Sequence, residues 1–214
     1  MSNLEDKLDK LHTVLNSMKS AVIGFSGGVD SSFLAAAAYK VLGERAIAVT
    51  ACSETLPESE AEEAAAIAKH IGIQHVFMSI SELDSPQFIA NDVSRCYYCK
   101  RQRFSALADW ALQSGYQWVL EGSNADDVSD FRPGMKAVDE LKNVTSPLLT
   151  VGLSKEEIRK VAKEWGIPNY NKPSAACLSS RIAYGLPITA ERLRQVEKAE
   201  KKVKEFFSQI ASAN

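Results

Sequence analysis

The feature that most constrains the fold is the loop at residues 26–31, Ser-Gly-Gly-Val-Asp-Ser, which directly follows an apolar run at residues 21–25. An apolar run without polar alternation predicts a strand buried on both faces, and residues 32–42 predict a helix. A turn between them exposes backbone N–H groups at a positive helix N-terminus, where an anion can bind. Two glycines let the backbone approach that anion closely. The sequence therefore predicts an α/β fold with a phosphate-binding turn.

The pattern Ser-Gly-Gly-x-Asp-Ser lacks the Gly-Lys-Ser/Thr of a Walker A loop and is not a GxGxxG fingerprint. It resembles the PP-loop of the ATP pyrophosphatases, which split ATP between the α and β phosphates and adenylylate a substrate. The serine hydroxyls add donors, and Asp30 can hold Mg²⁺ or its waters. A glycine-rich turn with a helix cap is the plainer alternative, but here a strand, glycines, an acid and a helix coincide.

Length and charge limit the function classes. A chain of 214 residues holds one sizeable α/β domain and a small appendage. Its 25 basic and 27 acidic residues give a net charge of −2, which provides no general attraction to nucleic acid. A polar start and the lack of a long apolar stretch exclude a signal peptide and a membrane helix. We therefore expect a cytoplasmic protein whose cysteines are free, metal-bound or catalytic rather than disulfide-bonded.

Apolar segments alternate with helical patterns through the first part of the chain. We predict strands over 46–51, 75–80 and 118–122, and helices over 57–71 and 99–113. This βαβ series predicts a doubly wound, mainly parallel sheet, whose ligands bind at the carboxyl ends of the strands. The PP-loop and the strand-end segments 50–53 and 121–124, which include Gly122, should therefore line one crevice.

Two more helices are expected towards the end of the chain. Ser154 and Glu157 form a capping box for the first, which should stop at Gly166. The last, over 189–207, carries an apolar stripe that needs a partner. The stripe comprises Leu193, Val196, Ala199, Val203, Phe206 and Ile210. We expect a PP-loop domain over 1–188, with 189–214 as a C-terminal helix that begins a truncated or missing second domain.

Cys96 and Cys99 form a C-x-x-C, which fits a thioredoxin-like redox site, a zinc half-site, iron–sulfur ligands or chance. A thioredoxin-type pair follows a first strand, whereas this pair should precede a helix in mid-chain. Cys177, His70 and His75 are available for zinc, but none is paired at the usual short spacing. Thiolates from Cys96, Cys99 and Cys177 would leave one iron of a 4Fe-4S cluster open for a ligand such as hydrosulfide. Cys52 fits a small buried apolar residue better than a ligand.

Two loops mix cations with hydroxyls or acids. Residues 171–181 contain a lysine, serines, a cysteine and Arg181, whose guanidinium could grip a phosphate bidentately. An ordinary connection with turn serines is the alternative. Residues 126–134 contain three acids, which suit a solvated loop, and Arg132, which is the better site candidate.

Together the PP-loop, Cys-Tyr-Tyr-Cys-Lys, Asp-Phe-Arg-Pro-Gly-Met-Lys-Ala and Cys-Leu-Ser-Ser-Arg-Ile-Ala-Tyr-Gly resemble the LarE family, over residues 18–200. Members are ATP-dependent sulfur transferases that build the nickel-pincer cofactor of lactate racemase. The resemblance implies an adenine nucleotide alpha-hydrolase-like fold. It also implies adenylylation of a small-molecule partner, pyridinium-3,5-biscarboxylic acid mononucleotide, and replacement of AMP by sulfur to give a thiocarboxylate.

The resemblance implies the site residues as well. Ser26, Gly27, Gly28, Asp30 and Ser31 would bind the ATP phosphates and Mg²⁺, and we add Gly122, from its place at a strand end, and Arg132, from its loop, as cofactor-binding residues. The catalytic residues would be Asp30, Cys177, Ser180, Arg181 and Glu200, of which Ser180 and Arg181 would hold a phosphate.

One departure from the family pattern bears on the sulfur source. Ala176 stands where the sacrificial form has the cysteine that gives up its sulfur. Cys96, Cys99 and Cys177 match instead the branch whose three cysteines hold a 4Fe-4S cluster that carries the donated sulfur, so we expect catalytic turnover. The family's C-terminal α/β domain should be absent, because the chain stops at Asn214. We also expect a homo-oligomer, with the sulfur donor unidentified.

Two other functions stay open at this point. Several PP-loop enzymes with cysteine-bound clusters thiolate tRNA, but such proteins usually carry a basic stripe. A regulatory module that binds ATP without turnover would need no thiols, whereas this chain has three of them beside Asp30, Arg132 and Arg181.

Overall fold

The computed structural model describes residues 3–129, 133–174 and 176–212. At its centre lies a five-stranded sheet in the order β3-β2-β1-β4-β5, with every pair parallel. The strands are β1 (Ala21–Gly24), β2 (Ala46–Cys52), β3 (Gln74–Ser79), β4 (Trp118–Leu120) and β5 (Val144–Thr145). The predicted doubly wound parallel sheet is confirmed, and β5 is a strand that the sequence did not predict.

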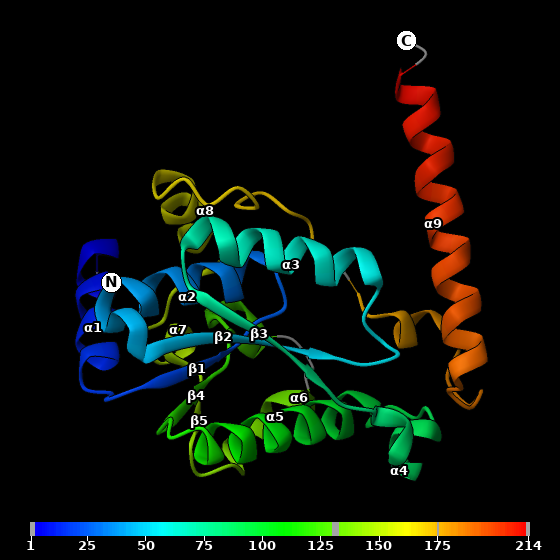
Figure 1. Ribbon diagram of the computed structural model, residues 1–214, viewed down its shortest axis with the longest axis horizontal. Coiled ribbons are helices and arrows are strands. Elements are labelled where there is room, and N and C mark those ends of the chain that lie inside the picture. Colours follow the sequence, from blue (N-terminus) through cyan, green and yellow to red (C-terminus); the bar gives the residue numbers. More distant parts are fainter. Residues whose placement is uncertain (1–2, 130–132, 175, 213–214) are drawn as a thin grey trace.

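Helices cover both faces of the sheet (Figure 1). One face carries α1 (Leu4–Asn16), α2 (Val29–Leu42), α3 (Glu58–Ile71) and α8 (Lys155–Glu164), and the other carries α5 (Arg95–Gln113) and α6 (Pro133–Asp139). The short helices α4 (Pro86–Ile89) and α7 (Pro147–Thr150) lie in connections. Along β1, Ile23 packs into the core of the first face and Val22 into the core of the second. Burial on both faces explains why β1 is apolar throughout.

The observed start of α2 changes the shape of the loop. This helix begins at Val29, three residues before the predicted start, because the extended Gly28 is its N-cap. Asp30 therefore lies in the first turn, where the helix dipole favours a carboxylate. The predicted capping box of Ser154 and Glu157 is confirmed at the start of α8.

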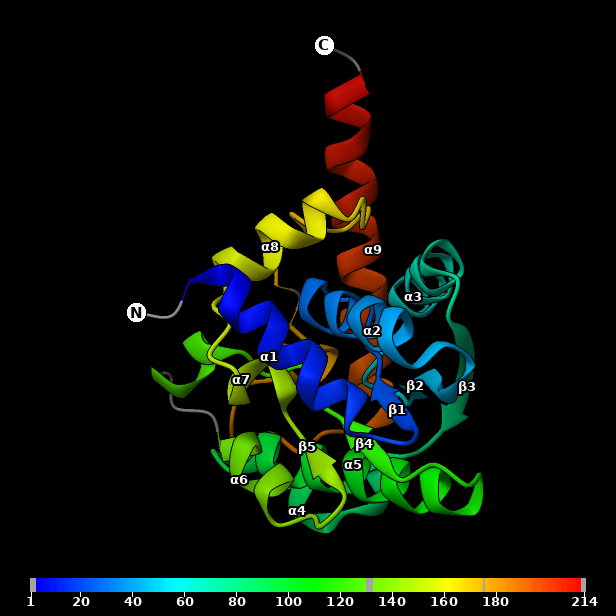
Figure 2. The ribbon, with the colours of Figure 1, turned by 90° about the vertical axis from the view of Figure 1, so that its left-hand side faces the viewer.

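The last helix, α9 (Ala190–Ser212), stands beside the carboxyl ends of the strands, and its outer half projects away from the body (Figures 1 and 2). At its base Leu193 is 1% exposed and Val196 packs against the same small core. Further along, Val203 and Phe206 are exposed. In the described part of the chain, the predicted apolar stripe thus has a partner along its first half only. The division of the chain at residue 188 stays a prediction.

No helix in the described ranges combines the length and the apolar character needed to cross a bilayer.

Candidate functional site

The PP-loop, residues 26–31, follows β1 and continues into the first turn of α2. Gly27 has a φ of +70°, and an added Cβ would lie 3.0 Å from the Cα of Ala64 on α3. Conformation and space therefore both exclude a side chain here. Ser31 Oγ donates to the Gly28 carbonyl at 3.1 Å and accepts from the Ser26 amide at 3.3 Å. These bonds fix the loop around the N-terminus of α2, where an anion can bind.

Asn169, in the loop after α8, supports the PP-loop from behind. Its Nδ2 donates to the Gly27 carbonyl at 2.8 Å and to Ser32 Oγ at 3.1 Å. The side chain is buried, so these bonds are made away from water. Nothing local marked Asn169 as a site residue, because its partner lies 142 positions earlier in the chain.

Asp30, the predicted Mg²⁺-binding residue, is held between two side chains. Its Oδ2 pairs with Lys155 Nζ at 2.5 Å, and its Oδ1 accepts from Asn124 Nδ2 at 3.3 Å. Its side chain is 24% exposed, so a cation can reach the carboxylate. The sequence analysis missed Lys155, the first residue of α8. A cation in the first turn of a helix is unfavourable, because the helix dipole is positive at that end. This unfavourable position of Lys155 is the feature of the sequence that could have indicated a functional role.

Two cavities meet at the PP-loop. The smaller cavity, about 290 Å³, lies among the PP-loop, the ends of β2 and β4, and α5. The larger cavity, about 840 Å³, lies among the PP-loop, the loop that carries Cys177, and α9. Most of the predicted site residues line one or both. Ser26, Gly28 and Asp30 line both cavities, Ser31 and Gly122 the smaller, and Cys177, Arg181 and Glu200 the larger.

Three predicted residues are placed differently. Gly27 is turned against α3 and is not among the described residues that line either cavity. Ser180 is also absent from those linings; it is exposed, and its Oγ donates to the Cys177 carbonyl at 2.7 Å. Arg132 lies outside the described residues.

The smaller cavity contains an ion pair that the sequence analysis did not predict. Lys100 Nζ lies 2.9 Å from Glu121 Oε1, and Glu121 Oε2 accepts from the Ser123 amide and from Ser146 Oγ. Burial on its own would raise the pKa of Glu121, but Lys100 and these hydrogen bonds lower it below its usual value. Glu121 therefore stays ionised and holds Lys100 at the carboxyl end of β4.

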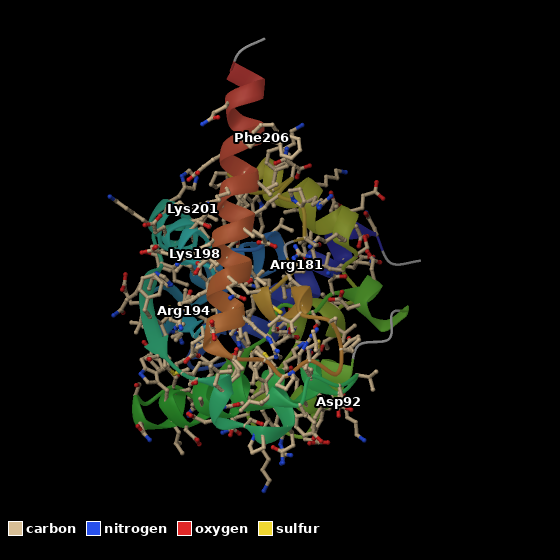
Figure 3. All side chains as sticks on the ribbon, turned by 90° about the vertical axis from the view of Figure 1, so that its right-hand side faces the viewer. Asp92, Arg181, Arg194, Lys198, Lys201 and Phe206 are labelled. Atoms are coloured by element: carbon tan, nitrogen blue, oxygen red, sulfur yellow. The ribbon has the colours of Figure 1, made fainter. Side chains whose placement is uncertain are left out.

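Charged pairs also line the larger cavity. Arg181 Nε donates to Glu200 Oε1 at 2.7 Å, and Figure 3 shows Arg181 beside α9. Lys172 Nζ binds carboxylates of Glu60 and Glu63 on α3, at 2.6 and 2.8 Å. An anionic ligand entering this cavity would meet cations whose present partners are carboxylates of the protein itself.

The structure corrects the predicted position of the Cys-x-x-Cys pair. Cys96 and Cys99 do not precede a helix but lie in the first two turns of α5, which begins at Arg95. The helix starts early because Asp92 Oδ1 accepts from the Ser94 amide, and because Arg95 Nη1 donates to Asn91 Oδ1. A spacing of three residues then places both thiols on one side of α5.

Cys177 lies near this pair. Burial raises the pKa of the Cys99 thiol to about 12, Arg103 opposes that rise, and Glu82, Cys177 and Cys96 add to it. Contacts place the Cys177 loop against the start of α5, because Arg95 Nη1 donates to the Ser179 carbonyl at 2.9 Å and Leu178 belongs to the small core against which Cys99 packs. Within the described ranges, no three His, Cys, Asp or Glu residues lie close enough together to hold a single metal ion.

The other residues considered for zinc are engaged elsewhere. His75 Nε2 lies 2.8 Å from Thr50 Oγ1, and burial lowers the pKa of its ring. His70 Nε2 lies 3.0 Å from the Gly166 carbonyl oxygen. Cys52 is half-buried at the end of β2, and burial raises the pKa of its thiol although Arg103 opposes the rise. These placements suit structural roles.

The sequence of this chain matches the family model for NAD synthase over residues 2–184. The chain belongs to the NAD synthase family. Membership confirms the predicted PP-loop and an ATP-dependent enzyme.

An uncharacterized protein of Synechocystis is 43% identical over 197 residues, which cover 92% of this chain and 73% of that protein. The pyridinium-3,5-bisthiocarboxylic acid mononucleotide synthase of Lactiplantibacillus plantarum is 33% identical over 202 residues, with coverages of 94% and 73%. This second relative confirms the resemblance to the LarE family. The structure of NMN synthetase from Francisella tularensis matches with a TM-score of 0.64 at 20% identity, covering 93% of this chain and 94% of that one. This match shows the fold.

Proposed function

We propose that this enzyme adenylylates a carboxylate of pyridinium-3,5-biscarboxylic acid mononucleotide and then replaces AMP by sulfur, which gives a thiocarboxylate. One observation carries the proposal: Asp30 of the PP-loop lines the same cavity of about 840 Å³ as Cys177, Arg181 and Glu200. ATP chemistry and sulfur chemistry can therefore meet in one chamber. The similarity to a synthase of the corresponding bisthiocarboxylic acid supports this substrate.

In the first step a substrate carboxylate oxygen attacks the α-phosphorus of ATP, and the bond to pyrophosphate breaks. The amides at the start of α2, with the hydroxyls of Ser26 and Ser31, bind the phosphates. Asp30 binds Mg²⁺, which offsets the charge on the departing pyrophosphate. Lys155, which now pairs with Asp30, lies within reach of a phosphate in the same place. Arg181 binds the anionic substrate from the opposite wall.

For the sulfur we propose a 4Fe-4S cluster held by Cys96, Cys99 and Cys177. The donor set fits this group, because the Cys177 loop packs against the start of α5, where Cys96 and Cys99 lie, and each thiolate of a cluster binds a different iron rather than one shared ion. When bound, the cluster would supply an open iron that carries a transferable sulfur. We also propose a cytoplasmic location. The enzyme would use ATP as a substrate, and its cysteine thiols would have to stay reduced. A homo-oligomer stays a prediction.

The basic residues of α9 favour tRNA thiolation as a second candidate. Arg194, Lys198 and Lys201 follow one another along the outward side of α9 (Figure 3). Acidic residues are interspersed on the same helix, however, including Glu197 and Glu200. A tRNA-binding protein would lose affinity steeply with rising salt. Electrophoretic shift assays over a range of salt concentrations separate this candidate from the first.

The proposed function is tested on anaerobically reconstituted protein. We expect pyrophosphate, AMP and the thiocarboxylate from ATP, the mononucleotide and sodium sulfide, together with iron and acid-labile sulfide in the protein. Cys96→Ala, Cys99→Ala or Cys177→Ala should each remove the iron and the sulfur transfer but leave pyrophosphate formation intact. Cys52→Ala is the matched control and should keep both. A Cys177→Ala protein with a complete cluster would show that the cluster assignment is wrong.

A further inference from the structure

Arg103 projects from α5 between the carboxyl ends of β2 and β3. Its Nε donates to Glu82 Oε1, and its Nη2 donates to Thr55 Oγ1 at 2.6 Å and to Ser53 Oγ at 3.1 Å. Its remaining nitrogen, Nη1, makes no hydrogen bond to any described residue. Three contacts thus fix the plane of the guanidinium group. The N–H donors of Nη1 stay available to a ligand.

The position of Arg103 links the two cavities. Five described residues line both cavities: Ser26, Gly28, Asp30, Leu56 and Arg103. Arg103 is the one basic side chain among them. Arg103 is paired with Glu82, as Lys100 is with Glu121 and Arg181 is with Glu200, but each of these other two cations lines one cavity only. Arg103 therefore lies where the two cavities meet, beside the PP-loop.

The partner of Arg103 is a buried carboxylate, while the Arg103 side chain itself is 25% exposed. Glu82 is fully buried, and its Oε2 has no hydrogen-bond partner. Cys99 Sγ lies 3.8 Å from Glu82 Oε1. Burial on its own would lower the pKa of Arg103, but Cys99, Glu82 and Cys177 raise it above its usual value. The guanidinium therefore carries a permanent positive charge beside the thiols.

We propose that Arg103 is a further catalytic residue, whose Nη1 binds the carbonyl oxygen of the acyl adenylate and stabilises its negative charge as sulfur attacks. This inference rests on the proposed function. Glu82 is a positioning residue that holds the guanidinium plane through Nε. The direction of the Nη1 donor decides whether the oxyanion is bound. A substitution that keeps the positive charge but moves this donor should therefore still slow the attack by sulfur.

The step balances without an oxidant or a reductant. Hydrosulfide attacks the carbonyl carbon, a C–S bond forms, and one electron pair of the C=O bond moves to the oxygen that Arg103 binds. When the pair returns, the C–O bond to AMP breaks and AMP leaves with its electron pair. The hydrosulfide proton passes to solvent, and the product is a thiocarboxylate.

The test measures adenylylation and sulfur transfer separately in Arg103→Lys. This variant keeps a cation beside Glu82 but loses the planar guanidinium with its Nη1 donors. Substrate-dependent exchange of pyrophosphate into ATP reports adenylylation, and sodium sulfide-dependent AMP release reports sulfur transfer. Loss of one oxyanion donor should slow AMP release by about 100- to 1000-fold. Exchange should stay close to the wild-type rate. Arg101→Lys, on the exposed side of the same helix, is the matched control and should change neither rate.

Glu82→Gln tests the positioning role, because it removes the ion pair and keeps the guanidinium. It should slow AMP release less than Arg103→Lys and leave exchange intact. The inference is overturned if Arg103→Lys releases AMP at the wild-type rate, or if it slows both half-reactions equally. Wild-type protein that exchanges no pyrophosphate would instead overturn the proposed function, and the inference with it.

Discussion

The two walls of the larger cavity are built in different ways. The PP-loop wall, residues 26–31, is fixed by hydroxyl bonds within the loop, by contact of Gly27 with α3 and by the buried Asn169. The Cys177 wall, residues 176–181, is mostly exposed, and its amide link to the body runs from Leu178 to the Thr55 carbonyl at 3.3 Å. The comparison indicates that the wall proposed to bind ATP is preformed, whereas the wall proposed to serve sulfur transfer depends more on what binds there.

Asp30→Ala should have the largest effect, because it removes the proposed ligand for Mg²⁺. Formation of AMP and pyrophosphate should fall by about 1000-fold or more, since the charge on the departing pyrophosphate is no longer offset. The melting temperature should change little, because Asp30 is partly exposed. Pyrophosphate release assays check this, with Asp139→Ala, an exposed acid at the end of α6, as control. Wild-type production of ADP and phosphate would contradict the PP-loop assignment.

Arg181→Ala tests the other wall. Loss of a charge-assisted contact to the substrate should cost about 2–4 kcal/mol of transition-state stabilisation. Stability should hardly change, because the ion pair with Glu200 is exposed at 48% and 32%. Steady-state kinetics and thermal unfolding are measured together, with Arg194→Ala on α9 as control. Equal losses of activity and stability would assign Arg181 a structural role. Arg132→Ala, whose position lies outside the described residues, should likewise lower turnover more than stability.

Asn169→Ala should reverse that pattern and lower stability first. It leaves the Gly27 carbonyl and Ser32 Oγ without their buried donor, which should lower the free energy of unfolding by about 1–3 kcal/mol. ATP affinity should fall with it, because the loop loses its support. Urea unfolding and ATP titration check this, and Asn171→Ala, in the exposed part of the same loop, is the control. If Asn169→Ala is as stable as the wild type, the bonds within the PP-loop are sufficient to keep its conformation.

The smallest effect concerns Cys99 and pH. Burial raises the pKa of this thiol to about 12 in the folded protein, so the fold favours its protonated form. The resulting stability is present below the pKa of the unfolded thiol, near pH 8.5–9, and is lost as pH rises towards 12. Relative to Cys99→Ser, the cluster-free wild type should lose about 1.4–2 kcal/mol more stability between pH 7 and pH 10. Parallel pH profiles of the two proteins would contradict a buried thiol.

The sequence predicted those features whose causes are local. The apolar run before the PP-loop, the two glycines and the capping box at Ser154 each act over a few residues, and each was placed correctly. The start of α5 was placed too late, because the helix depends on Asp92 and Ser94, which precede the cysteines. The strand β5 was not predicted, because two residues are too few to show a periodic pattern.

Missed site residues share a different cause. Asn169, Lys155 and Arg103 act through partners 142, 125 and 21 positions away. Each is an ordinary polar residue in its own segment, and only the fold brings it to the PP-loop or the thiols. Residues that belong to a sequence motif could therefore be predicted. The isolated side chains that support or complete the motifs in the folded protein could not.

The bond from Asn169 to Gly27 also bears on how the protein is made. The PP-loop leaves the ribosome well before its support, which is synthesised 142 residues later. Domains form as units during synthesis at about 5–20 residues per second, so for roughly ten seconds or more the nascent chain carries a PP-loop without its buried amide. A nascent chain should therefore gain tight ATP binding late and in one step, after the loop that follows α8 has folded back onto α2.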